Sequence, residues 1–379
     1  MKYMGSKRWM LKNGLGDVIA REVKSATRFV DFFGGSGAVS THVATKYEIP
    51  VIAYDLQTFS AVLSRAVVER EATIEGELLW AQWYKRARDV RRTFRPPSAL
   101  NVSRAAVKEQ RRWCGEQLGL VTKSYGGYYF SANQAVWLDA LRQTLPEREP
   151  ERTVALAAIV CAASQCAAAP GHTAQPFQPT RTAKPFLADA WHRRVVDYCE
   201  NALSAISEQC AKVRGRAEVA DANEAAAAID KGDLAFIDPP YSGVHYSRFY
   251  HVLETIARGQ CSAVSGEGRY PALDERPRSR YSLKSESAVA LDELFLTVAS
   301  RGGKAIVTFP QRGCSNGLSG KIVLELASKH FKVEQHWVAS KFSTLGGNND
   351  HRNARRSTRE LILVLRAQQV GGSRAGGPL

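Results

Sequence analysis

Residues Asp233 to Tyr241 read DLAFIDPPY. An apolar run leads directly into an acid, two prolines and a tyrosine, so the stretch predicts a buried strand that ends in a rigid polar turn. In open α/β sheets, ligands bind at the carboxyl ends of the strands. The turn formed by Asp238, Pro239, Pro240 and Tyr241 is therefore the first candidate site.

The residue types in this turn suit chemistry on an amino group. Prolines lack an N–H, but their carbonyls still accept hydrogen bonds. An amino group held between the Asp238 carboxylate and the Pro239 carbonyl would be drawn from planar toward tetrahedral geometry, which exposes the nitrogen lone pair. Tyr241 offers a ring on which a nucleic-acid base stacks, an interaction of roughly 1–3 kcal/mol. A tight turn without chemistry is the alternative for the tetrapeptide alone.

A glycine-rich turn precedes this site in the chain. Asp31 to Gly37 (DFFGGSG) follows the apolar run Arg28–Phe32 and precedes a helical pattern. Glycines let backbone N–H groups approach a ligand, and the helix N-terminus favours a carboxylate or phosphate. The spacing is not G-x-G-x-x-G and no G-K-[ST] follows, which disfavours dinucleotide and P-loop sites.

The next apolar run, Pro50–Tyr54, ends at Asp55. An acid at this point can bind both hydroxyls of a ribose. A helix N-cap for the segment that begins at Thr58 is the alternative for Asp55. Together with the glycine turn, Asp55 predicts a nucleoside cofactor whose other end is an amino-acid or phosphate group.

Three further apolar runs complete the predicted sheet: Lys304–Phe309, Lys332–Val338 and Glu360–Leu365. The last two have no helical pattern between them, so they predict an antiparallel hairpin at the sheet edge. The fold class is α/β, with a Rossmann-like sheet. Residues 58–217 are mainly helical and rich in Ala and Arg, which predicts an inserted domain. The sheet domain then comprises residues 1–57 and 218–366, and residues 367–379 form a disordered tail.

Composition narrows the classes of partner. The 379 residues include 52 Lys and Arg against 37 Asp and Glu, a net charge of +15 that favours a polyanion. No apolar run approaches the roughly 20 residues that cross a bilayer, and the start of the chain is too polar for a signal peptide, so we expect a cytoplasmic protein with no membrane contact. Seven cysteines without C-x-x-C and eight histidines without a zinc spacing predict no metal.

The order of these motifs resembles the D12-class family of N6-adenine-specific DNA methyltransferases, in the alpha arrangement. The segment KYMGSK at residues 2–7 is similar to the family's N-terminal cofactor segment. The resemblance implies a fold built on a sheet that binds S-adenosylmethionine. It implies contacts with this cofactor from Tyr3, Lys7, Asp31, Phe32, Gly34, Gly35, Gly37, Asp55, Asp221 and Asp238. Phe32 stands where relatives commonly carry proline.

The resemblance also implies the reaction, which is direct methyl transfer to N6 of an adenine flipped out of double-stranded DNA. Asp238, Pro239, Pro240 and Tyr241 would be the catalytic residues. The implied partners are double-stranded DNA and, as a candidate, a cognate restriction endonuclease or another subunit of a defence system. A bacterial or phage origin is expected.

Four arginines are candidate DNA contacts. Arg248 follows the DPPY turn closely and would line the pocket of the flipped base or the loop that clamps it. Arg352, Arg355 and Arg356 precede the last apolar run and are candidate phosphate contacts, with a solvated basic loop as their alternative. Other activities stay open at this point: methylation of cytosine N4 or of an RNA adenine, or a DNA-binding subunit without turnover. The aspartate that opens the tetrapeptide weighs against cytosine N4, because relatives with that activity usually carry serine there.

Overall fold

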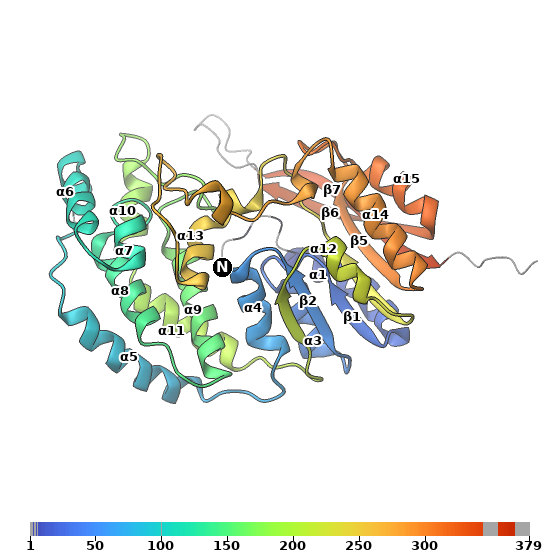
Figure 1. Ribbon diagram of the computed structural model, residues 1–379, viewed down its shortest axis with the longest axis horizontal. Coiled ribbons are helices and arrows are strands. Elements are labelled where there is room, and N and C mark those ends of the chain that lie inside the picture. Colours follow the sequence, from blue (N-terminus) through green and yellow to red (C-terminus); the bar gives the residue numbers. More distant parts are fainter. Residues whose placement is uncertain (1–2, 4, 6, 100, 344–354, 368–379) are drawn as a thin grey trace, which may run out of the picture.

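A computed structural model describes residues 3, 5, 7–99, 101–343 and 355–367 (Figure 1). The chain forms a lobe built on a sheet and a lobe built only of helices, which lie side by side. Within the described ranges, no helix has the length and apolar character needed to cross a membrane. The predicted disordered tail lies outside the described residues, apart from Ala367, which ends the last strand.

The sheet has seven strands in the order β3-β2-β1-β4-β5-β7-β6. Their bounds are β1 Arg28–Asp31, β2 Val51–Asp55, β3 Arg216–Val219, β4 Asp233–Ile237, β5 Lys304–Pro310, β6 Phe331–Ser343 and β7 Arg355–Ala367. The first five in this order are parallel, whereas β7 runs antiparallel between β5 and β6. The predicted α/β class and antiparallel hairpin are confirmed, with β6 as the edge strand.

Helices cover both faces of the sheet because neighbouring residues of each strand point to opposite sides. In β1, Phe29 belongs to the apolar core on one face and Val30 to the core on the other. The first core contains helices α1 (Arg8–Leu11), α2 (Leu15–Glu22) and α3 (Ala38–Lys46). The second contains α12 (Ala222–Ala225), α14 (Ser287–Ser300) and α15 (Gly320–His330).

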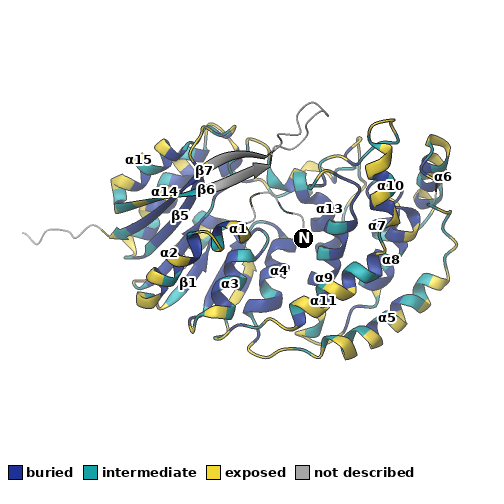
Figure 2. Ribbon diagram, turned by 180° about the vertical axis from the view of Figure 1, so that it is seen from behind, coloured by how far each residue is buried: buried dark blue, intermediate teal, exposed yellow. Residues whose placement is uncertain are grey.

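The helical lobe packs around α9 (Glu151–Cys166), whose alanine-rich surface is buried on nearly every side (Figure 2). Its other helices are α5 (Gly76–Arg92), α6 (Arg104–Gly115), α7 (Leu120–Tyr125), α8 (Ala132–Gln143), α10 (Lys184–His192) and α11 (Val195–Ser207). Helix α13 (Tyr246–Arg258) also joins this lobe, because Tyr250, Leu253 and Ile256 are buried in the same core. The residues just after the DPPY turn therefore lie on the helical side.

Helix α4 (Thr58–Val68) connects the lobes, since Phe59 and Val62 belong to the core of the helical lobe while Val68 belongs to the sheet core. The buried Glu254 carboxylate on α13 accepts the backbone N–H groups of Thr58 and Phe59, both at 3.1 Å. This carboxylate supplies the cap that the N-terminus of α4 needs. The junction beside Asp55 is thus fixed from the helical side.

The predicted division into residues 1–57, 58–217 and 218–366 stays a proposal. Two observations favour moving its boundaries: α4 packs against β2 and β3, and β3 pairs with β2. We therefore propose that the insertion begins after Val68 and ends before Arg216. Strand β3 was not predicted, because its exposed Arg216 and Glu218 leave only Ala217 buried and no apolar run marks it.

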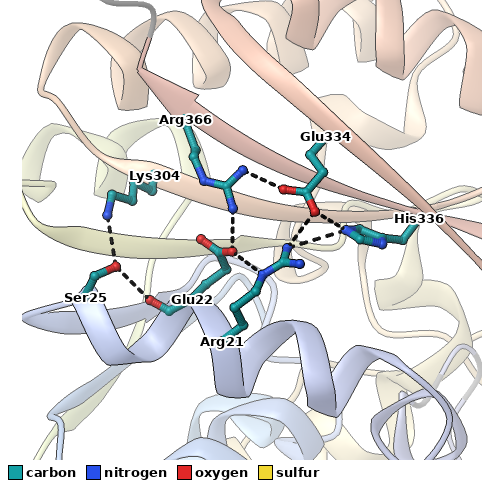
Figure 3. Close-up of polar contacts among 7 residues, drawn as sticks. All are labelled: Arg21, Glu22, Ser25, Lys304, Glu334, His336 and Arg366. Carbon is teal, nitrogen blue, oxygen red and sulfur yellow. Dashed lines mark hydrogen bonds and ion pairs between the residues drawn. The ribbon is translucent and has the colours of Figure 1, made fainter.

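A charged network fastens the β6/β7 hairpin to α2 (Figure 3). Arg366 donates to Glu22 at 2.7 Å and to Glu334 at 2.6 Å, and Arg21 contacts the same two carboxylates at 2.8 and 2.9 Å. Hydrogen bonds from Arg366 lower the pKa of Glu334 to about 2. Glu22 is 5% exposed, and its buried carboxylate is paired with two guanidinium groups.

Replacing Glu22 with Gln should destabilise the fold by about 1–3 kcal/mol, because two arginines then lose their buried carboxylate. Thermal unfolding should show a Tm lower by several degrees. Glu325→Gln is the control, since Glu325 forms only an exposed pair with Lys321 at 3.8 Å. Equal Tm shifts in the two variants would contradict this role for Glu22.

Candidate active site

A cavity opens where the carboxyl ends of β1, β2 and β4 face the start of α13. Together with its open mouth it encloses about 920 Å³. The sheet order reverses between β1 and β4, which is where open α/β sheets bind ligands. The predicted site residues that line it are Tyr3, Lys7, Asp31, Phe32, Gly34, Gly35, Asp55, Asp221, Asp238, Pro239, Pro240 and Tyr241. Gly37 does not line it, but lies at the N-cap of α3 with φ +70°.

The Lys7 amine lies between two carboxylates. It is 3.0 Å from Asp238 Oδ1 and 3.0 Å from Glu360 Oε2, and Lys7 is only 4% exposed. The three residues come from the N-terminal segment, the end of β4 and the middle of β7. A single buried cation therefore joins the most distant parts of the chain at the cavity wall.

Burial and ion pairing oppose one another in this cluster. Burial by itself lowers the pKa of the Lys7 amine, but Asp238 and Glu360 raise it above its ordinary value, so Lys7 stays charged. Burial raises the pKa of Asp238, while Lys7 acts in the opposite sense. The Asp238 carboxylate thus depends on Lys7 for its charged form.

Sequence analysis missed Glu360, which was assigned only as the first residue of an apolar strand. The pairing of Pro310 with Glu360 in the β5/β7 ladder brings this acid to the cavity edge. Glu360 could have been recognised because it is an acid at the start of the apolar run ELILVL. A buried charge at such a position is costly unless it is paired.

Two further residues that sequence analysis missed hold the DPPY turn. Thr308, whose neighbour Val307 pairs with Ile237, donates from Oγ1 to Asp238 Oδ1 at 2.8 Å. Asn316 Nδ2 donates to the carbonyl of Pro240 at 2.7 Å and to that of Tyr281 at 2.9 Å. The turn is consequently fixed on both sides of Pro239.

The glycine turn and the acid that follows β2 bind each other. Gly35, with φ +52°, donates its N–H to Asp55 Oδ2 at 2.8 Å, and Gln57 donates to Oδ1 at 2.9 Å. A Cβ on Gly35 would lie 3.0 Å from the Tyr3 hydroxyl, so the close approach requires glycine. Burial raises the pKa of Asp55, whereas the hydrogen bonds from the N–H groups of Gly35 and Gln57 lower it.

Asp31 and Asp221 place two more carboxyl groups in the cavity wall. Asp31 accepts hydrogen bonds from Ser40 Oγ at 2.5 Å and from the N–H of Phe33 at 3.2 Å. Burial nevertheless raises its pKa to about 7. Asp221 is the N-cap of α12 and accepts the N–H of Asn223 at 2.8 Å. Four aspartates face one lysine in this cavity, so its interior is acidic.

Aromatic rings build the wall on the helical side. Tyr3 stacks on Tyr250 with ring centres 4.7 Å apart, and Tyr241 makes edge contacts with Tyr246 and Phe309 at 6.5 Å. Gly5 has φ +72°, and a Cβ there would lie 2.0 Å from the Tyr241 hydroxyl. The N-terminal segment therefore passes directly over the DPPY tyrosine.

The predicted DNA contacts are only partly described. Arg248 is exposed on α13 next to Ser247, a residue of the cavity wall. Arg352 lies outside the described residues. Arg355 and Arg356 begin β7, but their side chains are not described. Within the described part of the chain, no group of three or more His, Cys, Asp or Glu side chains is arranged to hold a metal.

Replacing Lys7 with Met should leave Asp238 and Glu360 without their cation and cost about 3 kcal/mol near pH 8. The pKa of Asp238, already raised, rises further, so the folded state keeps a proton that the unfolded chain releases. The cost therefore grows as the pH rises above the unfolded pKa of about 4 and is small near pH 5. Urea unfolding of both proteins at the two pH values measures this.

The double variant Lys7→Met/Glu360→Gln is the control, because it removes one of the two carboxylates. It should regain part of the stability lost near pH 8. A loss that is the same at both pH values would show that Lys7 does not neutralise these acids.

Comparisons with known proteins identify the family of this chain. A sequence model of the D12 class N6 adenine-specific DNA methyltransferase family matches residues 3–96 and 124–299. Modification methylase LlaI of Lactococcus lactis subsp. lactis is 25% identical over 310 residues, which cover 78% of this chain and 44% of the relative. The type II methyltransferase M.FokI of Planomicrobium okeanokoites is 25% identical over 319 residues, which cover 78% and 42%.

Modification methylase StsI of Streptococcus sanguinis is 23% identical over 320 residues, covering 79% of this chain and 42% of the relative. The chain thus spans less than half the length of these three relatives. The family match includes all of the predicted residues that line the cavity, from Tyr3 to Tyr241. The resemblance found in the sequence is confirmed, and the chain belongs to the D12 class of N6 adenine-specific DNA methyltransferases.

Proposed function

We propose that this chain transfers a methyl group from S-adenosylmethionine to N6 of an adenine flipped out of double-stranded DNA. The observation that carries the proposal is the position of the Asp238 carboxylate. Lys7 and Thr308 fix it at the cavity wall, beside the carbonyl of Pro239. Asn316 donates to the carbonyl of Pro240, whereas no described residue donates to the carbonyl of Pro239, which can therefore receive a substrate amine.

The cavity suits a nucleoside that carries positive charge. Asp55, held by two backbone N–H groups, presents a fixed carboxylate for a ribose, and Phe33, Leu56 and Ala222 give apolar walls for a base. Asp31 is buried and pairs with no cation among the described residues. An ammonium or sulfonium group would supply the charge that this carboxylate lacks. When bound, S-adenosylmethionine provides an activated methyl group on such a sulfonium.

The protein's own residues then have to align and polarise the acceptor. Asp238 and the Pro239 carbonyl would accept the two N–H groups of the adenine amine and orient its lone pair toward the cofactor side. Tyr241, whose plane is fixed by Tyr246 and Phe309, would stack on the base. The reaction needs no covalent enzyme intermediate, so catalysis rests on alignment and electrostatics.

The family match supports adenine N6 over cytosine N4 or an RNA adenine as the target. The names of the relatives describe modification methylases, which supports a role beside a restriction endonuclease or another defence subunit in a bacterial or phage-infected cytoplasm. The presence of Tyr3, Lys7, Asp55 and Asp238 together in the cavity wall supports an active enzyme over a DNA-binding subunit without turnover.

Replacing Asp238 with Asn should lower methyl transfer at least about 100-fold, because the charged acceptor of the amine is lost while its shape is kept. Incorporation of labelled methyl groups into DNA measures the rate, and nucleoside analysis of the product separates N6-methyladenine from N4-methylcytosine. Asp17→Asn, a change at an exposed acid of α2, is the control. Near-normal turnover of the Asp238 variant would overturn the proposal.

Cofactor binding should weaken as the pH falls from about 8 to 6, by up to about tenfold. The pKa of Asp31 is about 7 in the free protein, and a cationic ligand favours its ionised form, so binding is strongest above that pH. Calorimetric titration at several pH values measures this. Asp31→Asn should bind more weakly and lose most of the pH dependence, and an unchanged profile would exclude Asp31 as the responsible group.

A further inference from the structure

Two arginines lie at the mouth of the cavity. Arg248 follows Ser247 and Arg276 precedes Pro277, and both of these neighbours line the cavity. The guanidinium carbons of Arg248 and Arg276 lie 5.1 and 5.3 Å from the ring centre of Tyr270. One tyrosine ring thus holds two cations where a substrate has to enter.

A second arrangement of the same kind lies next to the first. The guanidinium carbons of Arg111 and Arg269 lie 4.2 and 4.6 Å from the ring centre of Tyr128. Arg269 and Tyr270 are consecutive residues, so one turn connects the two rings. We call Arg111, Arg248, Arg269 and Arg276 the arginine track. It runs from the cavity mouth onto the helical lobe.

The turn that joins the two rings has a fixed conformation. Arg269 has φ +53°, in the left-handed region that side chains rarely adopt. Gly268 precedes it, and a Cβ there would lie 2.5 Å from the carbonyl oxygen of Ala174. Tyr129 Oη donates to the carbonyl of Gly268 at 2.9 Å. The unfavourable backbone of Arg269 is therefore maintained by its surroundings.

Within the described part of the chain, no carboxylate lies within 4.0 Å of these four arginines. Glu267 interacts electrostatically with Arg111, but from beyond that distance. The acids of the same segment bind elsewhere: Glu275 accepts from Ser262 and Glu267 from Gln178. Arg276 Nε is buried without a hydrogen-bond partner among the described residues. Four clustered cations that form no ion pair with a described carboxylate are expected to attract an external polyanion.

We propose that the arginine track binds the DNA backbone beside the flipped adenine, with Arg248 and Arg276 at the phosphates nearest the cavity. The proposal rests on the proposed function, because it assumes that the strand leaves the cavity through this mouth. Guanidinium groups stacked on rings are pre-oriented, so they lose little freedom when they bind phosphate. Continuity with the cavity favours DNA over an acidic protein segment.

Two of the four arginines bind the local backbone, and the other two are available to contact phosphate. Arg269 Nε donates to the carbonyl of Ser124 at 2.8 Å, and Arg111 Nε donates to that of Gly127 at 3.0 Å, so both hold the local backbone. Arg248 donates Nε to Tyr270 Oη at 3.1 Å and is otherwise exposed. Arg248 and Arg276 are consequently the pair to test.

The test is the double variant Arg248→Gln/Arg276→Gln in the full chain. Binding to a labelled duplex is followed by fluorescence anisotropy at several salt concentrations. Two lost phosphate contacts should weaken binding roughly 10- to 100-fold near 0.15 M salt and reduce the slope of log K against log salt by about 2. The KM for DNA should rise while kcat and cofactor affinity change little.

The matched control is Arg301→Gln/Lys321→Gln, which removes two exposed charges from α15 and the end of α14. It should leave the salt slope unchanged. If the Arg248→Gln/Arg276→Gln variant keeps the wild-type affinity for DNA and the wild-type salt dependence, the proposal that the arginine track binds DNA is wrong. If the proposed function itself fails, the unaltered chain will not methylate duplex DNA, whereas failure of the track alone leaves that methylation intact, so the two failures are distinguishable. Unchanged Tm values exclude misfolding as the cause.

Discussion

A single buried amine holds the active-site wall together. Lys7 is almost excluded from water, and it is stable there only because Asp238 and Glu360 each lie 3.0 Å from its nitrogen. Removing Lys7 leaves two carboxylates in the wall without their cation, whereas removing either acid leaves Lys7 paired with the other. Since the three residues come from the N-terminal segment, the end of β4 and β7, the ion cluster requires these three parts of the chain to be in place together. The charged form of Asp238 is thus tied to the completed fold.

The hairpin that carries Glu360 is attached to the N-terminal segment at two points. One is the Lys7 cluster, and the other is the network of Arg21, Glu22, Glu334 and Arg366 on α2 and the hairpin (Figure 3). Two separate attachments prevent the hairpin from rotating about either one. The network is partly exposed to water, whereas the buried Lys7 cluster sets the position of the Asp238 carboxylate. The stability of the network on α2 therefore supports the geometry of the Lys7 cluster.

The features that could be predicted from the sequence are local. An apolar run followed by DPPY, a glycine turn and an acid after the next run each place a side chain at the end of its own strand, and the parallel sheet brings those ends together. Glu360, Thr308 and Asn316 could not be predicted, because their positions depend on the register of β5 and β7 and on a loop far along the chain. Strand β3 carries too little apolar surface to be recognised, and α13 joins the helical lobe only through tertiary packing.

The distribution of charge between the cavity and its mouth fits two ligands of opposite sign. Inside, Asp31, Asp55, Asp221 and Asp238 face a single lysine, whereas Arg248 and Arg276 stand at the entrance. A cationic nucleoside is favoured in the interior, and a polyanion is repelled by those acids but attracted at the rim. Exposed charges lose influence beyond about 8 Å in physiological salt, so each set acts mainly on the ligand next to it. The backbone of a nucleic acid would therefore stay at the mouth, and only a neutral base would enter the acidic interior.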